Sequence, residues 1–247
     1  MRTSYSALST YQTCPLKFKF QEIDKIKAPK SIEAVFGNAI HSSLRFMFER
    51  TPLYPTLDEV IDFFSNRWQD LAGQNQNNND NKWDEQTIQA YFDDGIAILK
   101  KFYKTNQPWN FNVLDLESRF EVLIEDKKTN QSHILTGIID RIDKTDDDCY
   151  EIIDYKTGRR MPPQNSVDQD LQMSIYHLGL IKRWPHLTPE KIKLSLYFLK
   201  HGEKIVTRRS PEQLEETKML VINTINCLLY TSPSPRDLST SRMPSSA

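Results

Sequence analysis

Residues 137–160, GIIDRIDKTDDDCYEIIDYKTGRR, constrain the fold of this chain more than any other stretch. The apolar runs GII and EII are short and β-branched, and the polar segment KTDDD between them is typical of a turn, so the stretch predicts two buried strands. The first strand is expected to end at Asp140, and Asp154 follows the second apolar run. In a hairpin these two carboxylates can meet across the strands, which raises the pKa of each unless a cation intervenes.

The first half of the chain has the apolar spacing of helices. Ser6 is expected to cap a short N-terminal helix, and Pro15 suits the first turn of a second one. Residues 31–50 repeat apolar side chains at helical intervals and predict a long amphipathic helix. Two more helical stretches, at about 57–71 and 83–105, are separated by the polar segment GQNQNNNDN, which predicts an inserted helical pair with an exposed loop.

The second half changes to shorter, β-branched segments between polar turns. The expected elements are strands at 112–125, 133–144 and 150–157, a helix at about 168–183, strands at 191–200 and 204–209, and a last helix at 211–227. The order α-βββ-α-β predicts an α/β (α+β) fold with a central mixed sheet flanked by helices. A length of 247 residues fits a single domain over 1–227, with the helical insertion at about 51–110.

The last segment, residues 228–247, changes abruptly to serine, proline, threonine and arginine. Such a composition cannot bury enough apolar surface to fold, so we expect disorder there. The segment also resembles the translated sequencing-adapter read-through found at the ends of assembled metagenomic genes. We therefore expect the tail to be non-native and the chain to be truncated at its C-terminus.

Composition and charge exclude few partners. The formal net charge is −1, so no overall basic field indicates nucleic acid, although an acidic site can hide a basic surface in the total. Three cysteines without CxxC spacing, and an N-terminus without an apolar signal region, predict a cytoplasmic protein without a disulfide framework. No apolar run approaches the roughly 18 residues that a membrane span requires, so no membrane association is expected.

Asp154 and Lys156 form the strongest candidate site. Side chains two apart on a strand point to the same face, so this acid and base lie side by side while Tyr155 points away. An isolated pair of this kind is usually a surface salt bridge, but the flanking apolar runs indicate a buried sheet. Asp140, Asp154 and the main-chain carbonyl of Tyr155 are hard oxygen ligands that suit Mg²⁺ or Mn²⁺. Lys156 could then orient an attacking water or neutralise charge on a phosphodiester.

Other polar residues have a structural and a functional interpretation. The remaining aspartates of the opening stretch are expected to be turn residues: Asp143, Asp146, Asp147 and Asp148. His41 alone would be a helix-surface histidine, but Gly37 one turn earlier is unfavourable in a helix unless another group approaches the backbone closely. Gln172 and Tyr176 are one helical turn apart at the rim of a buried face.

Four motifs together resemble a known family. They are GNAIH (37–41), GIIDRID (137–143), DYKTG (154–158) and QMSIY (172–176). Their order and approximate spacing resemble the GxxxH, GxxDRxD, DYKT and QxxxY motifs of RecB-type nucleases in the PD-(D/E)XK superfamily. The segment YSALSTYQTCPLKFKF also resembles the N-terminal part of stand-alone RecB-like and AddB-like members. The resemblance spans roughly residues 5–227 and is weakest in the middle helices.

The resemblance implies a restriction-endonuclease-like core and a Mg²⁺- or Mn²⁺-dependent DNA exonuclease of the DNA repair or recombination type. The roles it implies are metal binding for His41, Asp140 and Asp154, catalysis for Lys156, and support of the site or DNA contact for Gln172 and Tyr176. Any helicase partner has to be a separate chain, because the P-loop pattern GxxxxGK[ST] is absent. The alternative is a non-catalytic DNA-end binding subunit of a helicase–nuclease or CRISPR-adaptation-like complex.

The cysteines depart from the family pattern. Many relatives hold a 4Fe-4S cluster with a cysteine at the position of Cys14 and three more near the C-terminus, whereas this chain has only Cys149 and Cys227 besides. Either this branch lacks the cluster and Cys14 is a small buried residue, or the tail replaced the segment with the other ligands. We favour the second interpretation.

DNA contacts are less clearly encoded than the site. Arg159 and Arg160 directly follow the second strand and are expected to contact DNA. The lysines near Phe18 and Phe20 form either a phosphate-binding surface with stacking rings or a solvated face over a core.

Overall fold

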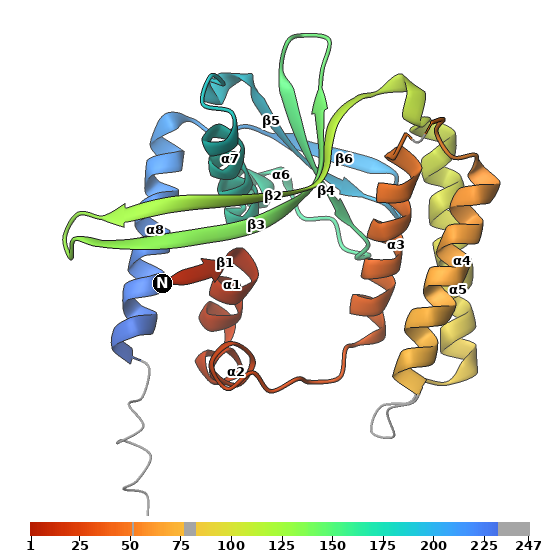
Figure 1. Ribbon diagram of the computed structural model, residues 1–247, viewed down its shortest axis with the longest axis horizontal. Helices are drawn as coiled ribbons and strands as arrows, with labels where there is room; N and C mark the ends of the chain where they lie inside the picture. The colour runs from red at the N-terminus through yellow and green to blue at the C-terminus, as the bar shows by residue number, and fades with distance from the viewer. Residues whose placement is uncertain (51, 77–82, 232–247) are drawn as a thin grey trace, which may run out of the picture.

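The structure is a computed structural model that describes residues 1–50, 52–76 and 83–231. Its elements are β1 (Arg2–Ser4), α1 (Tyr5–Thr13), α2 (Pro15–Phe18), η1 (Lys19–Ile23), α3 (Ile32–Phe48), α4 (Leu57–Gln76), α5 (Glu85–Thr105), η2 (Pro108–Asn110), β2 (Asn112–Asp126), β3 (Gln131–Lys144), β4 (Tyr150–Lys156), α6 (Gln164–Asp168), α7 (Leu171–Arg183), η3 (Pro189–Lys191), β5 (Ile192–Phe198), β6 (Glu203–Thr207) and α8 (Pro211–Thr231). Figure 1 shows the sheet between two groups of helices.

The strands form one six-stranded sheet in the order β1-β3-β4-β5-β6, and β2 also pairs with β3. β1 runs parallel to β3 and β4 runs parallel to β5, whereas the other three pairs are antiparallel. The predicted mixed sheet flanked by helices is therefore confirmed. Among the strands of the described residues, only β1 was missed, because a strand of three residues is too short to show an alternating pattern.

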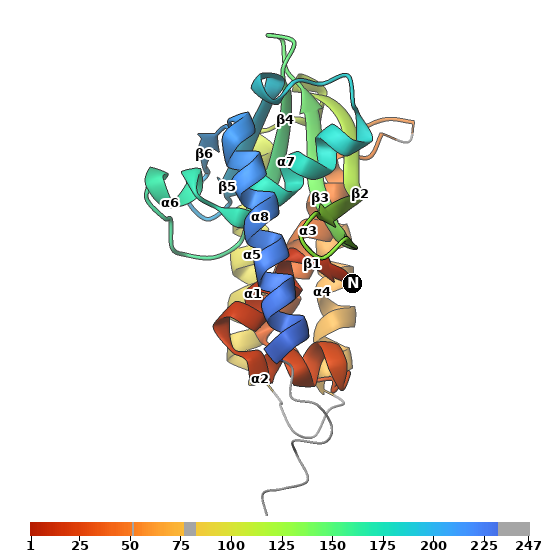
Figure 2. The same ribbon diagram turned by 90° about the vertical axis from the view of Figure 1, so that its left-hand side faces the viewer.

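Two hydrophobic clusters cover the two faces of the sheet. Ile152 of β4 packs in the cluster that contains α7 and α8, whereas its neighbours Ile153 and Tyr155 pack in the cluster with α3, α4 and α5. This division follows from the alternation of side chains along a strand. The views in Figures 1 and 2 place α7 and α8 on one side of the sheet and α3 to α5 on the other. Phe102 of α5 contacts the ring of Tyr155, so the inserted helices share the core of the sheet.

Several element ends differ from the predictions near the N-terminus and in the insertion. Ser4, not Ser6, caps α1, because β1 leads directly into the helix and the Ser4 hydroxyl accepts the N–H of Ala7. Helix α4 continues to Gln76, so the predicted loop begins later, and the rest of that segment lies outside the described residues. Of the two rings near the N-terminal lysines, Phe18 is buried and Phe20 is exposed.

The C-terminal helices also differ from their predictions. The helix predicted at 168–183 begins at Leu171 as α7, because Asp170 adopts an extended conformation and caps α7 by accepting the N–H of Met173. The short helix α6 before it was missed. Helix α8 extends to Thr231, into the segment that was expected to be disordered from residue 228. Leu228 is buried there in a small cluster with Ala7 and Phe18. The remainder of that tail lies outside the described residues. Among the described residues, no helix is both long and apolar enough to cross a membrane.

Candidate active site

Asp140 lies inside β3 rather than at its end, at a point where the strand is irregular. Residues two apart on a strand share a face, yet Ile139 and Ile142, three apart, both pack in the cluster on the α7 side. Asp140 is skipped in the β2–β3 pairing, as is Glu117 of β2, which has a φ of 46°. Such an irregularity bends a strand and re-aims a side chain. Here the Asp140 carboxylate reaches the edge of β4.

The Asp140 carboxylate joins β4 to helix α3. Its Oδ2 accepts the main-chain N–H of Tyr155 at 2.9 Å, and its Oδ1 lies 3.2 Å from Nδ1 of His41. Burial alone would lower the pKa of His41, but the contact with Asp140 and the charge of Asp154 outweigh it and raise that pKa. The structure therefore places His41 beside Asp140.

Asp154 and Lys156 lie side by side on the same face of β4. The Lys156 ammonium is 2.7 Å from Asp154 Oδ2, and the exposed fractions of the two side chains are 32% and 4% respectively. Burial is the main cause that raises the pKa of Asp154, to about 6; the charge of Asp140 adds to it, and Lys156 opposes it. The pKa of Lys156 is raised, because its acidic neighbours outweigh the effect of its own burial. Asp154 is thus a buried carboxylate whose negative charge is balanced by the Lys156 ammonium.

Gln172 of α7 connects both members of this pair. Its side-chain carbonyl accepts a hydrogen bond from Lys156 Nζ at 2.9 Å, and its amide group donates to Asp154 Oδ1 at 3.0 Å and to the Tyr176 hydroxyl at 2.7 Å. Gln172 can make both kinds of contact because its amide carries an acceptor and donors. The predicted rim residues therefore hold the acid–lysine pair in place.

Two residues that position α7 were missed from the sequence. Asp170 caps the helix, and the buried guanidinium of Arg209 donates to the Asp170 carbonyl at 3.1 Å, to the Val167 carbonyl at 2.9 Å and to the Ser174 hydroxyl at 2.7 Å. These bonds fix the corner between α6 and α7, two residues before Gln172. An aspartate directly before an apolar helical run is a capping signal that could have located the start of α7.

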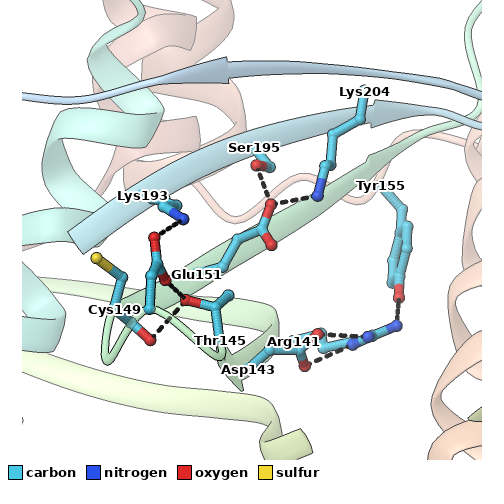
Figure 3. Close-up of polar contacts among 10 residues, drawn as sticks. Arg141, Asp143, Thr145, Cys149, Glu151, Tyr155, Lys193, Ser195 and Lys204 are labelled. Carbon is cyan, nitrogen blue, oxygen red and sulfur yellow. Dashed lines mark hydrogen bonds and ion pairs between the residues drawn. The ribbon is translucent and has the colours of Figure 1, made fainter. Parts of the chain in front are cut away.

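The interpretation of Asp143 as a turn residue is wrong. β3 continues past it, and its carboxylate is buried in a pair with the guanidinium of Arg141, which also donates to the Tyr155 hydroxyl (Figure 3). The Arg141 guanidinium lies 3.8 Å from the ring centre of Phe48 and 4.4 Å from that of Phe111. These contacts fix Tyr155, whose main chain holds Asp140.

Most of the other acids of the opening stretch have structural partners. Asp146, Asp147 and Asp148 lie in the turn between β3 and β4, as predicted. Asp148 pairs with Lys191 and Asp147 with Lys193. Glu151 of β4 is buried, and its carboxylate accepts from Ser195 and pairs with Lys204 (Figure 3). All these contacts lie apart from the Asp140–Asp154 cluster.

The donor set of the cluster fits a hard divalent cation, although its side chains are engaged with one another. In the described part of the chain, no three His, Cys, Asp or Glu side chains are arranged to hold a metal ion. Lys156, His41 and the Tyr155 N–H take up the carboxylate oxygens. Asp154 Oδ2 is buried and pairs with the Lys156 ammonium at 2.7 Å. A divalent cation beside this oxygen would be a second positive partner for a carboxylate that is out of contact with water.

The remaining predicted residues lie outside this cluster. Arg159 and Arg160 are exposed after β4, and Arg159 lines a hollow of about 430 Å³ that also includes Lys101 and Lys200. Cys14 lies between α1 and α2. Within the described residues, none of the three cysteines is part of a group of side chains that could hold a metal ion. No close approach explains Gly37: a Cβ there would meet the Thr157 hydroxyl at 3.5 Å, an ordinary contact.

The fold agrees with a comparison to known families. The sequence model of the PD-(D/E)XK nuclease superfamily matches residues 2–235. None of the curated proteins matches the chain. Among solved structures, the crystal structure of SSO0001 is 14% identical over 88% of this chain and 90% of that chain, with a TM-score of 0.39, a likeness too low to carry an argument. The chain belongs to the PD-(D/E)XK nuclease superfamily, whose members are typically nucleases that use divalent metal ions.

Proposed function

We propose that this protein is a Mg²⁺- or Mn²⁺-dependent DNA exonuclease of the RecB type, acting in DNA repair or recombination. The observation that carries the proposal is the meeting of residues from four elements: His41 of α3, Asp140 of β3, Asp154 and Lys156 of β4, and Gln172 of α7. Superfamily membership supports hydrolysis of phosphodiester bonds. The RecB-type motifs support the finer assignment.

The residues of the site would divide the work as follows. Asp140, Asp154, His41 and the Tyr155 carbonyl would hold the divalent ion, which supplies positive charge for water activation and for the scissile phosphate. The N–H and C=O of one strand residue leave the strand on the same side, so the Tyr155 carbonyl faces the same side as the N–H that bonds Asp140.

Lys156 would act on the reacting atoms. Its ammonium group can orient the attacking water or stabilise the charge that develops on the phosphate oxygens. Gln172 holds this ammonium beside Asp154, and Tyr176 holds the Gln172 amide. The Tyr176 hydroxyl remains protonated, because burial raises its pKa well above the ordinary value.

A second candidate function is a non-catalytic DNA-end binding subunit with a separate helicase partner. One observation favours it: Lys156 pairs directly with Asp154, so the ammonium and the carboxylate neutralise each other. In this case Lys156 and Asp154 form a structural pair, and the DNA contacts come from exposed residues such as Arg159 and Arg160.

End-labelled single- and double-stranded DNA, incubated with the protein with and without Mg²⁺, distinguishes the two candidates. We expect Mg²⁺-dependent shortening from an end, and its loss in Lys156→Ala with folding and DNA binding retained. Lys204→Ala is the matched control, because Lys204 also pairs with a buried acid but lies away from the site. Binding without cleavage by the wild type would support the second candidate, and full cleavage by Lys156→Ala would refute the role of Lys156.

A further inference from the structure

One edge of β3 has a gap beside the candidate active site. β2 occupies one edge of β3 along its whole length, from Gln131 to Lys144. The other two strands that pair with β3, β1 and β4, therefore share its opposite edge. On that edge β1 pairs as far as Thr136, and β4 begins to pair at Arg141. Residues 137–140 have no strand partner there. In Figure 1 the β2–β3 hairpin extends past β1, away from β4.

A groove of about 630 Å³ lies at this gap. It is lined by Arg2 and Tyr5 at the N-terminus, by Arg119 of β2, by Ile138 of β3, and by Gln172 and Tyr176 of α7. Gln172 and Tyr176 belong to the candidate active site as well, so the groove reaches the residue that bonds both members of the acid–lysine pair. We call it the Arg119 groove. A volume in this range accommodates a ligand of drug size.

The charges in the Arg119 groove suit a phosphate chain. The Arg119 side chain is exposed and makes no ion pair within the described residues. Arg2 pairs only with Glu121, and the exposed fractions of these side chains are 60% and 56%. Exposed pairs of this kind contribute at most about 1 kcal/mol, so a phosphate can replace Glu121 as the partner of Arg2.

The groove also offers apolar surface between the arginines. Ile138 is opposite Arg119 in the β2–β3 register and has an exposed fraction of 44%. The ring of Tyr5 is half-buried at the start of α1. Alternating cationic and apolar or aromatic groups are typical of surfaces that bind single strands, where the backbone meets cations and the bases meet rings.

We propose that the Arg119 groove guides one strand of DNA to the Asp154–Lys156 pair, with Arg119 and Arg2 on its phosphates and Ile138 and Tyr5 against its bases. This inference rests on the proposed nuclease function, because it assigns the path of the substrate to that site.

The test uses a fluorescent single-stranded oligonucleotide and the full chain. Binding is measured by anisotropy over a range of salt concentrations, and cleavage with Mg²⁺ gives kcat and KM. We expect Arg119→Gln to weaken binding of the oligonucleotide about tenfold, because a hydrogen bond between a guanidinium and a phosphate is stronger than one between neutral groups. The salt slope should fall by about 0.7 for each phosphate that the variant no longer neutralises. KM should rise more than kcat falls, and Arg2→Gln should act in the same direction.

Lys218→Gln is the matched control, because Lys218 of α8 is an exposed cation in a single exposed pair with Glu215. If the wild type cleaves and both arginine variants bind like Lys218→Gln, the groove proposal is overturned while the nuclease proposal stands. If the wild type binds without cleaving and Arg119→Gln weakens binding, the groove stands and the nuclease proposal fails. The groove proposal is also overturned if the wild type does not bind the single-stranded oligonucleotide.

Discussion

Gly179→Ala gives a sharp prediction, because Phe120 fills the space between two glycines. A Cβ at Gly179 of α7 would lie 2.5 Å from Phe120 Cγ, and one at Gly137 of β3 would lie 2.5 Å from Phe120 Cζ. Carbon atoms pack best about 3.5–4.0 Å apart, so each methyl group would intrude by about 1 Å. Gly137 is the first residue of the GIIDRID motif, and the packing of Phe120 against it is a structural reason for a glycine at this position.

The two substitutions differ in how far the ring can yield. Phe120 Cγ is fixed next to the strand backbone, whereas Cζ is at the far end of the ring. Overpacking costs about 1–3 kcal/mol, and the helix preference of alanine over glycine returns about 1 kcal/mol. Because the ring cannot yield at Cγ, we expect Gly179→Ala to lie at the upper end of this range and to reduce the free energy of unfolding by up to about 2 kcal/mol and the Tm by up to about 4–8 °C. Gly137→Ala should cost less, at about 1 kcal/mol or below.

Urea unfolding and thermal denaturation, followed by circular dichroism, measure both values. Phe120→Ala provides the control: it removes the clash, so adding Gly179→Ala to it should be neutral or stabilising. If Gly179→Ala is harmless in the wild-type background, or equally destabilising without the ring, the steric reasoning is wrong.

Three further predictions concern buried polar groups. Burial lowers the pKa of His177 from 6.5 to about 4 in the folded protein. As the pH falls, His177 is therefore protonated in the unfolded chain before it is protonated in the folded one, and this favours unfolding. About 3 kcal/mol of stability should be lost between pH 6.5 and 4, and His177→Phe should remove this part of the slope in urea unfolding at each pH. Asp143→Leu should cost about 3–5 kcal/mol in thermal unfolding by leaving Arg141 unpaired, and adding Arg141→Met should recover most of it. Arg209→Met should cost about 2–4 kcal/mol in urea unfolding and speed amide exchange at 167–174.

Each of these three has a clear contrary result. An unchanged pH slope in His177→Phe would show that another group carries the pH dependence. Strictly additive losses in the Arg141 and Asp143 variants would show that the two side chains do not act as a pair. Unchanged exchange at 167–174 in Arg209→Met would show that the α6–α7 corner holds without the guanidinium.

The sheet and most helices were predictable because their patterns are local and repeated. The strands around Ile139 and Ile152 combine β-branched residues with polar turns, and the helix around Ile40 repeats apolar side chains at helical spacing. The acid–lysine pair followed from strand alternation alone, since Asp154 and Lys156 are two residues apart. Gln172 and Tyr176 came from helical spacing, and their motif indicated the connection to the site.

The errors came from features that depend on the rest of the fold. Asp143 stands directly before the polar segment KTDDD, so its sequence context is that of a turn residue. The Asp143 carboxylate is buried because Arg141, its partner, is held between two aromatic rings, and the sequence does not show this. The irregularity at Asp140 depends on Glu117 in another strand. The break before α7 is stabilised by Arg209, which is distant in sequence. Pairings of this kind leave no periodic trace in a single sequence.

The central claim is that the acids around Asp154 hold a divalent ion beside Lys156, and a Mn²⁺ titration tests it most directly. Calorimetry on the wild type should show one site, weakened at least about tenfold in both Asp140→Asn and Asp154→Asn. Asp148→Asn, which changes an exposed turn acid, should leave the affinity unchanged. Equal Mn²⁺ affinity in the wild type, Asp140→Asn and Asp154→Asn would contradict the account.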